Sequence, residues 1–166
     1  MYGNFYLIIL YPLLYIFPAY AANGAPILFG GGRPLDLKKK FLGKRILGDS
    51  KTVRGAVAGI VCGVIVGIAE YPYFHYLLYI AIALSFGAVF GDLFGSFLKR
   101  QFGIKPGHGV IVLDQYGFFV FALLFALPQG NLPTAYGLLF LAILTGPMHL
   151  FSNMVAHRLR LKNVPW

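Results

Sequence analysis

The stretch LLYIAIALSFGAVFGDLFGSFL, residues Leu77–Leu98, decides how this chain folds. It is apolar and long enough for a membrane-spanning helix, which needs about 20 such residues. Its one charged residue is Asp92. An ionisable group inside a span is costly and by default indicates a functional site. Asp92 precedes Lys99 by about 10 Å of helix, so it lies near the end of the span and not at the bilayer centre.

Four further segments have the same apolar character, and they are Phe5–Ala22, Gly55–Tyr71, Val110–Leu127 and Thr134–Ala156. The whole chain is 58% hydrophobic and only 11% charged, which is too little charge for the surface of a soluble domain. The sequence therefore predicts an all-α integral membrane protein. Residues 1–166 form a single domain, a bundle of five transmembrane helices.

The basic residues are confined to three regions: a loop at about residues 30–54, the loop after the third span, and the C-terminal tail. They are Arg33, Lys38, Lys39, Lys40, Lys44, Arg45, Lys51, Arg54, Lys99, Arg100, Lys105, Arg158, Arg160 and Lys162. Five spans place these regions on one side of the membrane. Because cytoplasmic loops collect Lys and Arg, we expect an outside N-terminus and a cytoplasmic C-terminus. The net charge of +9 then reflects topology and does not indicate a nucleic-acid partner.

Glycines recur every four residues on two spans. The second span has Gly55, Gly59, Gly63 and Gly67, and the third has Gly87, Gly91 and Gly95. Small residues at this spacing let helix backbones approach closely in lipid. We expect close packing inside the bundle, with homodimerisation as the alternative.

Polar residues gather at the cytoplasmic end of the third and fourth spans. Asp92, Ser96 and Lys99 share one helix face, and Arg100 continues it. Asp114 opens the fourth span near the same rim. Two carboxylates beside several cations suit a divalent metal and phosphate oxygens. The alternative is that Asp92 and Asp114 only neutralise Lys99 and Lys105.

The second dense polar segment is LGDSKTVRG, Leu47–Gly55, which runs into the second span. Glycine, hydroxyl and basic groups at a helix N-terminus can hold phosphate through backbone N–H groups and the helix dipole. The Walker A pattern is absent. The alternative is a loop that contacts anionic lipid headgroups.

Several of these motifs together resemble the CTP:phosphatidate cytidylyltransferase superfamily. The residues that match the C-terminal signature motif of that superfamily are Ser96, Lys99, Arg100, Lys105, Pro106-Gly107-His108-Gly109 and Asp114. Asp49–Gly55 resembles the upstream Lys-Thr-x-x-Gly element. GGRPLD at Gly31–Asp36, together with the chain size, is similar to the small archaeal branch, the CDP-archaeol synthases. The resemblance covers roughly Asn23 to Tyr116.

The chain departs from the bacterial pattern at several places. Lys105 is followed by Pro106 and not by Asp, and Asp114 is followed by Gln115 and not by Arg. A second downstream Asp is also missing. These departures favour the archaeal branch and leave the metal-ligand set open.

The resemblance implies a CTP-dependent cytidylyltransferase of membrane phospholipid biosynthesis, located in the cell membrane with its site at the cytoplasmic face. Its acceptor would be an isoprenoid ether lipid phosphate, 2,3-bis-O-geranylgeranylglycerol 1-phosphate, and its products CDP-archaeol and pyrophosphate. Mg²⁺ would be held by Asp92 and Asp114, with a second cation left open. Lys99, Arg100 and Lys105 would neutralise phosphate charge. The remaining implied substrate contacts are Arg33, Asp36, Asp49, Ser50, Lys51, Thr52, Arg54, Ser96 and His108, of which Arg33, Asp36 and Asp49 could read cytosine.

Other functions fit the sequence less well. A CDP-alcohol phosphotransferase would show the run D-G-x-x-A-R, which is absent. A transporter or channel with a polar cytoplasmic vestibule is the main alternative, but channels place polar groups through the whole membrane thickness. A non-catalytic scaffold leaves Asp92 without a purpose.

Overall fold

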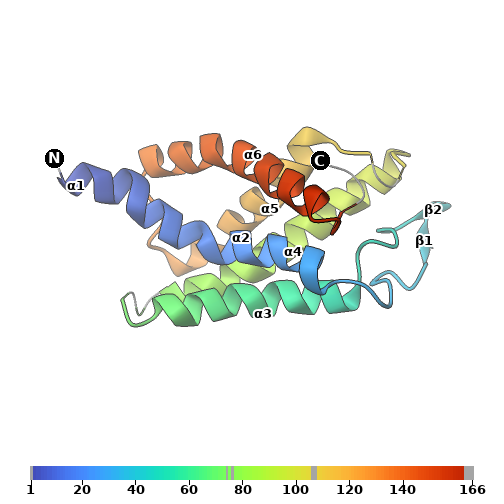
Figure 1. The fold of residues 1–166 in the computed structure, drawn as a ribbon, viewed down its shortest axis with the longest axis horizontal. Coiled ribbons are helices and arrows are strands. Elements are labelled where there is room, and N and C mark those ends of the chain that lie inside the picture. The colour runs from blue at the N-terminus through green and yellow to red at the C-terminus, as the bar shows by residue number, and fades with distance from the viewer. Residues whose placement is uncertain (1, 74, 76, 106–107, 163–166) are drawn as a thin grey trace.

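The structure, a computed structural model, describes residues 2–73, 75, 77–105 and 108–162 and is mostly helical (Figure 1). The chain begins with α1 (Tyr2–Phe5), which continues through the π-helical turn η1 (Tyr6–Leu10) into α2 (Tyr11–Phe29). The other long helices are α3 (Val53–Glu70), α4 (Leu77–Gln101), α5 (Ile111–Ala126) and α6 (Ala135–Arg158). The 3₁₀ turn η2 (Leu127–Gln129) follows α5 directly.

Five helices of the described chain are long and apolar enough to cross a membrane, which confirms the predicted number of spans. They are Tyr6–Phe29, Val53–Glu70, Leu78–Gln101, Val112–Gln129 and Ala135–Arg158. The first helix ends at Phe29 and not at the predicted Ala22.

Packing against α3 explains the longer first helix. Pro18 and Pro26 lie inside α2, and prolines normally break or kink a helix. Ala22 is nevertheless fully buried, and a Cβ built on Gly59 of α3 would lie 2.7 Å from the Ala22 carbonyl oxygen. The two backbones are therefore in direct contact, and this contact outweighs the weak local propensity.

The glycine stripes pack against helices of the same chain. Gly55, Gly59, Gly63 and Gly67 are all buried in α3. A Cβ on Gly91 of α4 would lie 2.8 Å from the Phe121 Cβ of α5. The prediction of close packing inside the bundle is confirmed. Because the stripes are used within one chain, they give no support to the homodimer alternative.

The core of the bundle is built from small and large apolar side chains of four helices. It includes Tyr15, Ile16 and Ala19 of α2, Leu84 and Ala88 of α4, Phe118 and Ala122 of α5, and Leu141 of α6. The small alanines let the helices approach, and the larger side chains fill the space between them.

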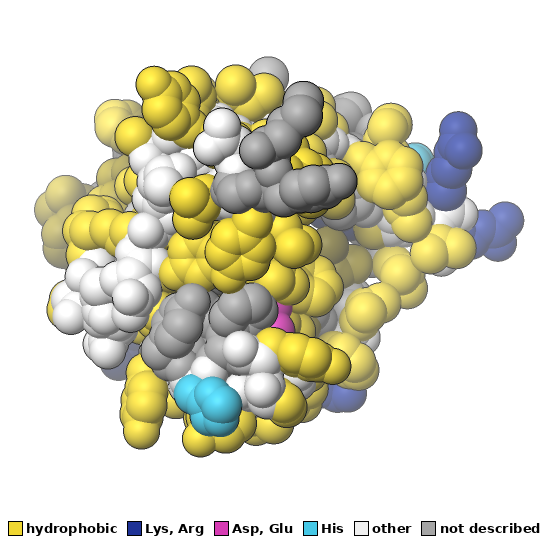
Figure 2. Space-filling view, turned by 90° about the vertical axis from the view of Figure 1, so that its left-hand side faces the viewer, with side chains coloured by type: hydrophobic (Ala, Val, Ile, Leu, Met, Phe, Trp, Pro, Cys, Tyr) yellow, Lys and Arg dark blue, Asp and Glu magenta, His cyan; other side chains and the backbone are white. Residues whose placement is uncertain are grey.

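The three basic regions lie toward one end of the bundle. Figure 1 shows the 30–52 segment, the end of α4 and the end of α6 toward the right, opposite the N-terminus. Hydrophobic side chains cover most of the opposite end face, and Lys and Arg appear only at its margin (Figure 2). The polar groups of the basic end are thus separated from an apolar end.

The 30–52 segment contains a short hairpin that the all-α prediction missed. Its strands β1 (Lys40–Phe41) and β2 (Lys44–Arg45) pair antiparallel, with Lys40 opposite Arg45. The turn residues Leu42 and Gly43 have φ of 49° and 78°. Two left-handed residues in a two-residue loop match the twist of a hairpin, so this turn specifies the pairing.

Candidate active site

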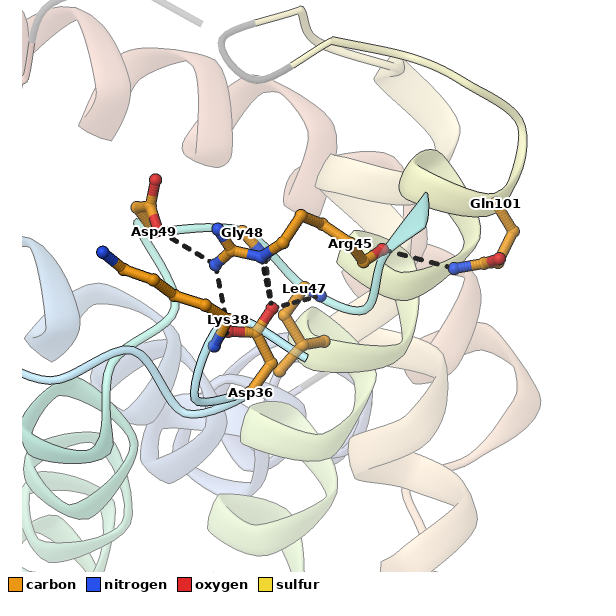
Figure 3. A network of polar contacts seen from close by, with 7 residues as sticks. All are labelled: Asp36, Lys38, Arg45, Leu47, Gly48, Asp49 and Gln101. Carbon is orange, nitrogen blue, oxygen red and sulfur yellow. Dashed lines mark hydrogen bonds and ion pairs between the residues drawn. The ribbon is translucent and has the colours of Figure 1, made fainter. Parts of the chain in front are cut away.

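Asp36 organises the loop at the basic end (Figure 3). Its carboxylate accepts hydrogen bonds from Arg45 Nε at 3.1 Å and Nη2 at 3.0 Å. It also accepts from the backbone N–H groups of Lys38, Leu47 and Gly48 at 3.0, 3.1 and 3.3 Å. Burial alone would raise the pKa of Asp36, but these bonds together lower it below its ordinary value. Asp36 therefore holds the loop together.

Arg45 joins this loop to the transmembrane bundle. Its guanidinium also contacts the exposed carboxylate of Asp49 at 2.9 Å. Gln101, at the end of α4, donates to the Arg45 carbonyl at 3.3 Å, and Lys44 Nζ donates to the Gln101 carbonyl at 2.5 Å. The hairpin is thus docked on α4. The sequence prediction counted Arg45 only among the basic residues and missed this role.

The last residues of the loop set the position of Lys51. The backbone around Lys51 is hydrogen-bonded to the start of the loop. Leu35 N–H donates to the Lys51 carbonyl at 2.8 Å, and Val53 N–H donates to the Arg33 carbonyl at 3.1 Å. The Thr52 hydroxyl accepts from Gly55 N–H at 3.1 Å and caps α3. Lys51 therefore has a fixed backbone on both sides.

Lys51 and Asp92 form an ion pair between the loop and α4. Lys51 Nζ lies 2.7 and 2.5 Å from the two carboxylate oxygens of Asp92. The side chains are 24% and 33% exposed, so solvent reaches the pair. Ser50 and Thr52 line a small cavity of about 20 Å³ beside it. The loop motif and the charged span, which lie far apart in the sequence, therefore meet in the structure.

Asp114 forms a second ion pair, with Lys99 of α4. Its other carboxylate oxygen accepts from Val110 N–H at 2.8 Å. Asp114 lies in the first turn of α5, where a negative charge is favourable. The pair therefore fixes the start of α5 against the end of α4.

These pairings differ from the alternative drawn from the sequence. In that alternative Asp92 and Asp114 neutralise Lys99 and Lys105. The structure does pair Asp114 with Lys99, but it pairs Asp92 with Lys51 of the loop. Lys105 is exposed, and its carbonyl accepts from Arg100 Nη2 at 3.4 Å. The reason is topological: the 30–52 loop folds back to the end of α4.

Two residues that were not among the predicted site residues lie near these ion pairs, one in the last turns of α6 and one just after the helix. Asn153 is 3% exposed, and its Oδ1 accepts from Lys162 Nζ at 3.0 Å. Lys162 interacts electrostatically with Lys51, Asp114, Lys99 and Asp92, so it lies near both ion pairs. A polar residue inside the last span was the available signal for Asn153.

The other predicted site residues lie around this centre. Arg33 and Arg54 are exposed and line a groove of about 670 Å³ along α3, together with Val57 and Val61. His108 is also exposed, whereas Ser96 is buried. The motif residues Pro106 and Gly107 lie outside the described residues.

The carboxylates at the centre can take part in a Mg²⁺ site but cannot form one alone. Within the described part of the chain, no three or more His, Cys, Asp or Glu side chains group as metal ligands. Mg²⁺ often binds one or two protein carboxylates and completes its shell with water and substrate phosphates. Asp92 and Asp114 fit that mode, provided that a polyphosphate supplies oxygens.

The fold and site define an intramembrane enzyme class. A solved structure described as "Structural insight into an intramembrane enzyme for archaeal membrane lipids biosynthesis" matches with a TM-score of 0.82 and 34% identity. The match covers 88% of this chain and 94% of that structure.

Sequence comparison identifies the family. The family described as CarS-like, CDP-archaeol synthase, matches residues 5–166. The CDP-archaeol synthase of Pyrococcus furiosus is 42% identical over 159 residues, which are 92% of this chain and 95% of the relative. That of Archaeoglobus fulgidus is 39% identical, over 96% of this chain and 98% of the relative. The chain belongs to the CDP-archaeol synthase family, which confirms the predicted resemblance.

Proposed function

We propose that this chain transfers the cytidylyl group of CTP to an archaeal ether lipid phosphate and so makes CDP-archaeol. The observation that carries the proposal is the Lys51–Asp92 ion pair, because it joins the two segments that the family resemblance assigns to one site. The acceptor is 2,3-bis-O-geranylgeranylglycerol 1-phosphate, and pyrophosphate is released.

The site lies at the cytoplasmic face of the cell membrane, with the N-terminus outside. The one-sided distribution of the 14 Lys and Arg residues along the sequence supports this orientation. CTP is soluble and approaches from water, whereas the acceptor stays in the membrane. A polar centre at the end of the spans is where the two substrates can meet.

The reaction needs positioning and charge neutralisation more than covalent catalysis. An oxygen of the acceptor phosphate attacks the α-phosphorus of CTP, and the bond from that phosphorus to the oxygen bridging to the β-phosphate breaks. The acceptor phosphate is already ionised, so no general base is required. Lys51, Lys99 and Arg100 neutralise charge on the phosphates of CTP and on the leaving pyrophosphate.

A Mg²⁺ ion at Asp92 and Asp114 would polarise the CTP phosphate oxygens. In the protein alone, Lys51 and Lys99 neutralise these same carboxylates. The two lysines therefore keep the acidic pair compatible with the membrane boundary until a substrate arrives. When CTP and Mg²⁺ bind, the two ammonium groups would exchange these carboxylate partners for phosphate oxygens.

The loop around Asp36 carries Lys51 and so borders the proposed nucleotide site. The Asp36 carboxylate is occupied by Arg45 and backbone donors, so its part in cytosine recognition is to position the loop. Asp49 has a side chain that is 74% exposed and stays a candidate for direct contact with the base, as does the exposed Arg33.

The test is product formation by the purified protein. It is incubated with Mg²⁺, labelled CTP and the unsaturated ether lipid phosphate, and the lipid extract is examined for a labelled CDP-lipid. Replacement of CTP by ATP, GTP or UTP should reduce product, since the site is proposed to select the base. Absence of product with every nucleotide would reject the proposal, and CTP flux into liposomes without turnover would support the transporter alternative.

A further inference from the structure

The chain reverses direction at the end of α6, and this reversal directs Lys162 back toward the bundle. Leu161 N–H donates to the Ala156 carbonyl and Arg160 N–H to the His157 carbonyl, both at 2.9 Å. Arg160 has a left-handed φ of 58°. These are the two hydrogen bonds and the left-handed residue of a Schellman motif. The turn is specific and places the tail beside the last turns of the helix.

Lys162 is held in this reversed position from two sides. Its carbonyl lies 3.0 Å from His157 Nδ1, and its Nζ donates to Asn153 Oδ1 at 3.0 Å. Asn153 is nine residues earlier and inside the last span. The ammonium therefore reaches back along the helix and does not extend into solvent.

Asn153 has an unsatisfied donor at this point. The side chain is 3% exposed, and its Nδ2 has no hydrogen-bond partner within the part of the chain that the structure describes. A buried donor left unpaired costs about 1–3 kcal/mol. Such a group is expected where a bound ligand supplies the missing acceptor.

The charges around Lys162 also favour binding of an anion. Lys51, Lys99 and Lys162 surround two carboxylates, Asp92 and Asp114, so cations are in excess. Burial and then the nearby charge of Lys51 lower the pKa of Lys162. Cations that are partly removed from water and close to each other are stabilised by a bound anion.

We propose that the tail forms one wall of the active site, where Lys162 Nζ and Asn153 Nδ2 bind a phosphate group of a substrate. The inference rests on the proposed function and adds two binding residues to it. The ligand chemistry is a phosphate oxygen, which either CTP or the acceptor lipid can supply. The experiment distinguishes these two sources.

The first comparison is Lys162→Ala against Arg158→Ala. Arg158 is exposed in the last turn of α6, so its variant removes the same charge from the same segment without removing the proposed contact. Loss of a charged hydrogen bond should raise the KM of the phosphate donor or acceptor that it binds by about tenfold or more. Lys162→Arg should retain most of the affinity, because it keeps a cation.

The second comparison isolates the amide donor. Asn153→Asp keeps an oxygen that can accept from Lys162 but replaces the Nδ2 donor. The KM for CTP or for the acceptor lipid should rise in this variant, although its unfolding temperature in detergent should match that of the wild type. This variant also tests the inference if Lys162→Ala folds poorly.

KM is measured for CTP at saturating acceptor and for the acceptor at saturating CTP. A rise in the CTP value assigns the contact to the nucleotide, and a rise in the acceptor value assigns it to the lipid. If both values for Lys162→Ala and Asn153→Asp equal those of Arg158→Ala, the inference is wrong although the proposed function stands. If the wild type gives no CDP-lipid, the proposed function fails, and equilibrium binding of CTP and of the lipid phosphate to the same variants still tests the contact.

Discussion

Asp92 is the residue on which we expect the proposed reaction to depend most. It is the acidic residue of the third span, and Lys51 donates to both of its carboxylate oxygens. Asn has the same shape but no charge, so it can neither pair with Lys51 in the same way nor attract a cation. In the proposed site Asp92 would hold the Mg²⁺ that neutralises charge on the reacting phosphates, and loss of one such stabilising interaction typically lowers kcat by about 10²–10³-fold.

We therefore expect Asp92→Asn to lower kcat for CDP-lipid formation by about 10²-fold or more. Turnover with labelled CTP measures the effect, and thermal unfolding in detergent shows whether the variant is folded. A folded Asp92→Asn protein with wild-type turnover would show that Asp92 is only a structural charge.

Asp36 acts on the loop and not on the reacting atoms. Asp36→Asn leaves the Arg45 guanidinium with the exposed Asp49 carboxylate as its remaining charged partner. It also weakens the hydrogen bonds made to the buried Asp36 side chain, with a local cost of about 2 kcal/mol. Hydrogen exchange of the Leu47 and Gly48 amides, which donate to Asp36, measures this directly. We expect faster exchange in the variant, and equal protection would contradict the assigned role.

The same network makes a prediction for pH. The pKa of Asp36 in the folded loop is below its ordinary value of 3.8, so its carboxylate is charged and bonded at all higher pH. Its contribution is therefore constant between about pH 5 and 8 and is lost as the pH falls below the ordinary value. After correction for intrinsic exchange rates, protection of Leu47 and Gly48 should stay constant over that range. A loss of protection between pH 7 and 5 would contradict this sign.

The helices are held together by glycines at particular points of contact. A Cβ on Gly91 would lie 2.8 Å from Phe121 Cβ, too close for either helix to accept without moving. Gly24 of α2 provides a matched control, because a Cβ there meets nothing within 4 Å.

Gly91→Ala should destabilise the protein by about 1–3 kcal/mol through overpacking. Gly24→Ala should be neutral or slightly stabilising, because alanine is the better helix former. Thermal unfolding of both variants in the same detergent provides the comparison. Equal unfolding temperatures would show that α4 and α5 do not pack as described.

Most of the helical elements could be predicted from the sequence, whereas their ends and pairings could not. Hydropathy gave the five spans, because each has to be apolar along its length. The predicted end of the first helix was wrong, because the helix continues where it packs against Gly59 of α3, a contact between segments far apart in the sequence. The hairpin around Leu42 was missed since left-handed residues other than glycine are rare.

The candidate site could also be predicted only in part. Asp92 and Asp114 could be identified because charge in or beside a span needs an explanation. Their partners, Lys51 and Lys99, depend on how the loop returns to α4, which spacing along the chain does not encode. Lys162 was missed for the same reason, because only the reversal after α6 brings its ammonium back to Asn153.

The molecule as a whole has a polar end and an apolar end, which predicts its orientation in the membrane. In a Cys62→Ser background, single cysteines at Asn131 and at Lys39 lie in exposed positions at the two ends. A membrane-impermeant maleimide applied to intact cells should label Asn131→Cys and leave Lys39→Cys unlabelled until the cells are opened. The reverse pattern would place the basic end outside and exclude cytoplasmic CTP as its substrate.

In the proposed function, the whole bundle brings CTP and a lipid phosphate together for cytidylyl transfer, and not for transfer of the terminal phosphate. Two parallel reactions separate these chemistries, one with CTP labelled at the α-phosphorus and one with CTP labelled at the γ-phosphorus. We expect the α label in the lipid product and the γ label in pyrophosphate. Appearance of the γ label in the lipid, or of neither label, would contradict the account.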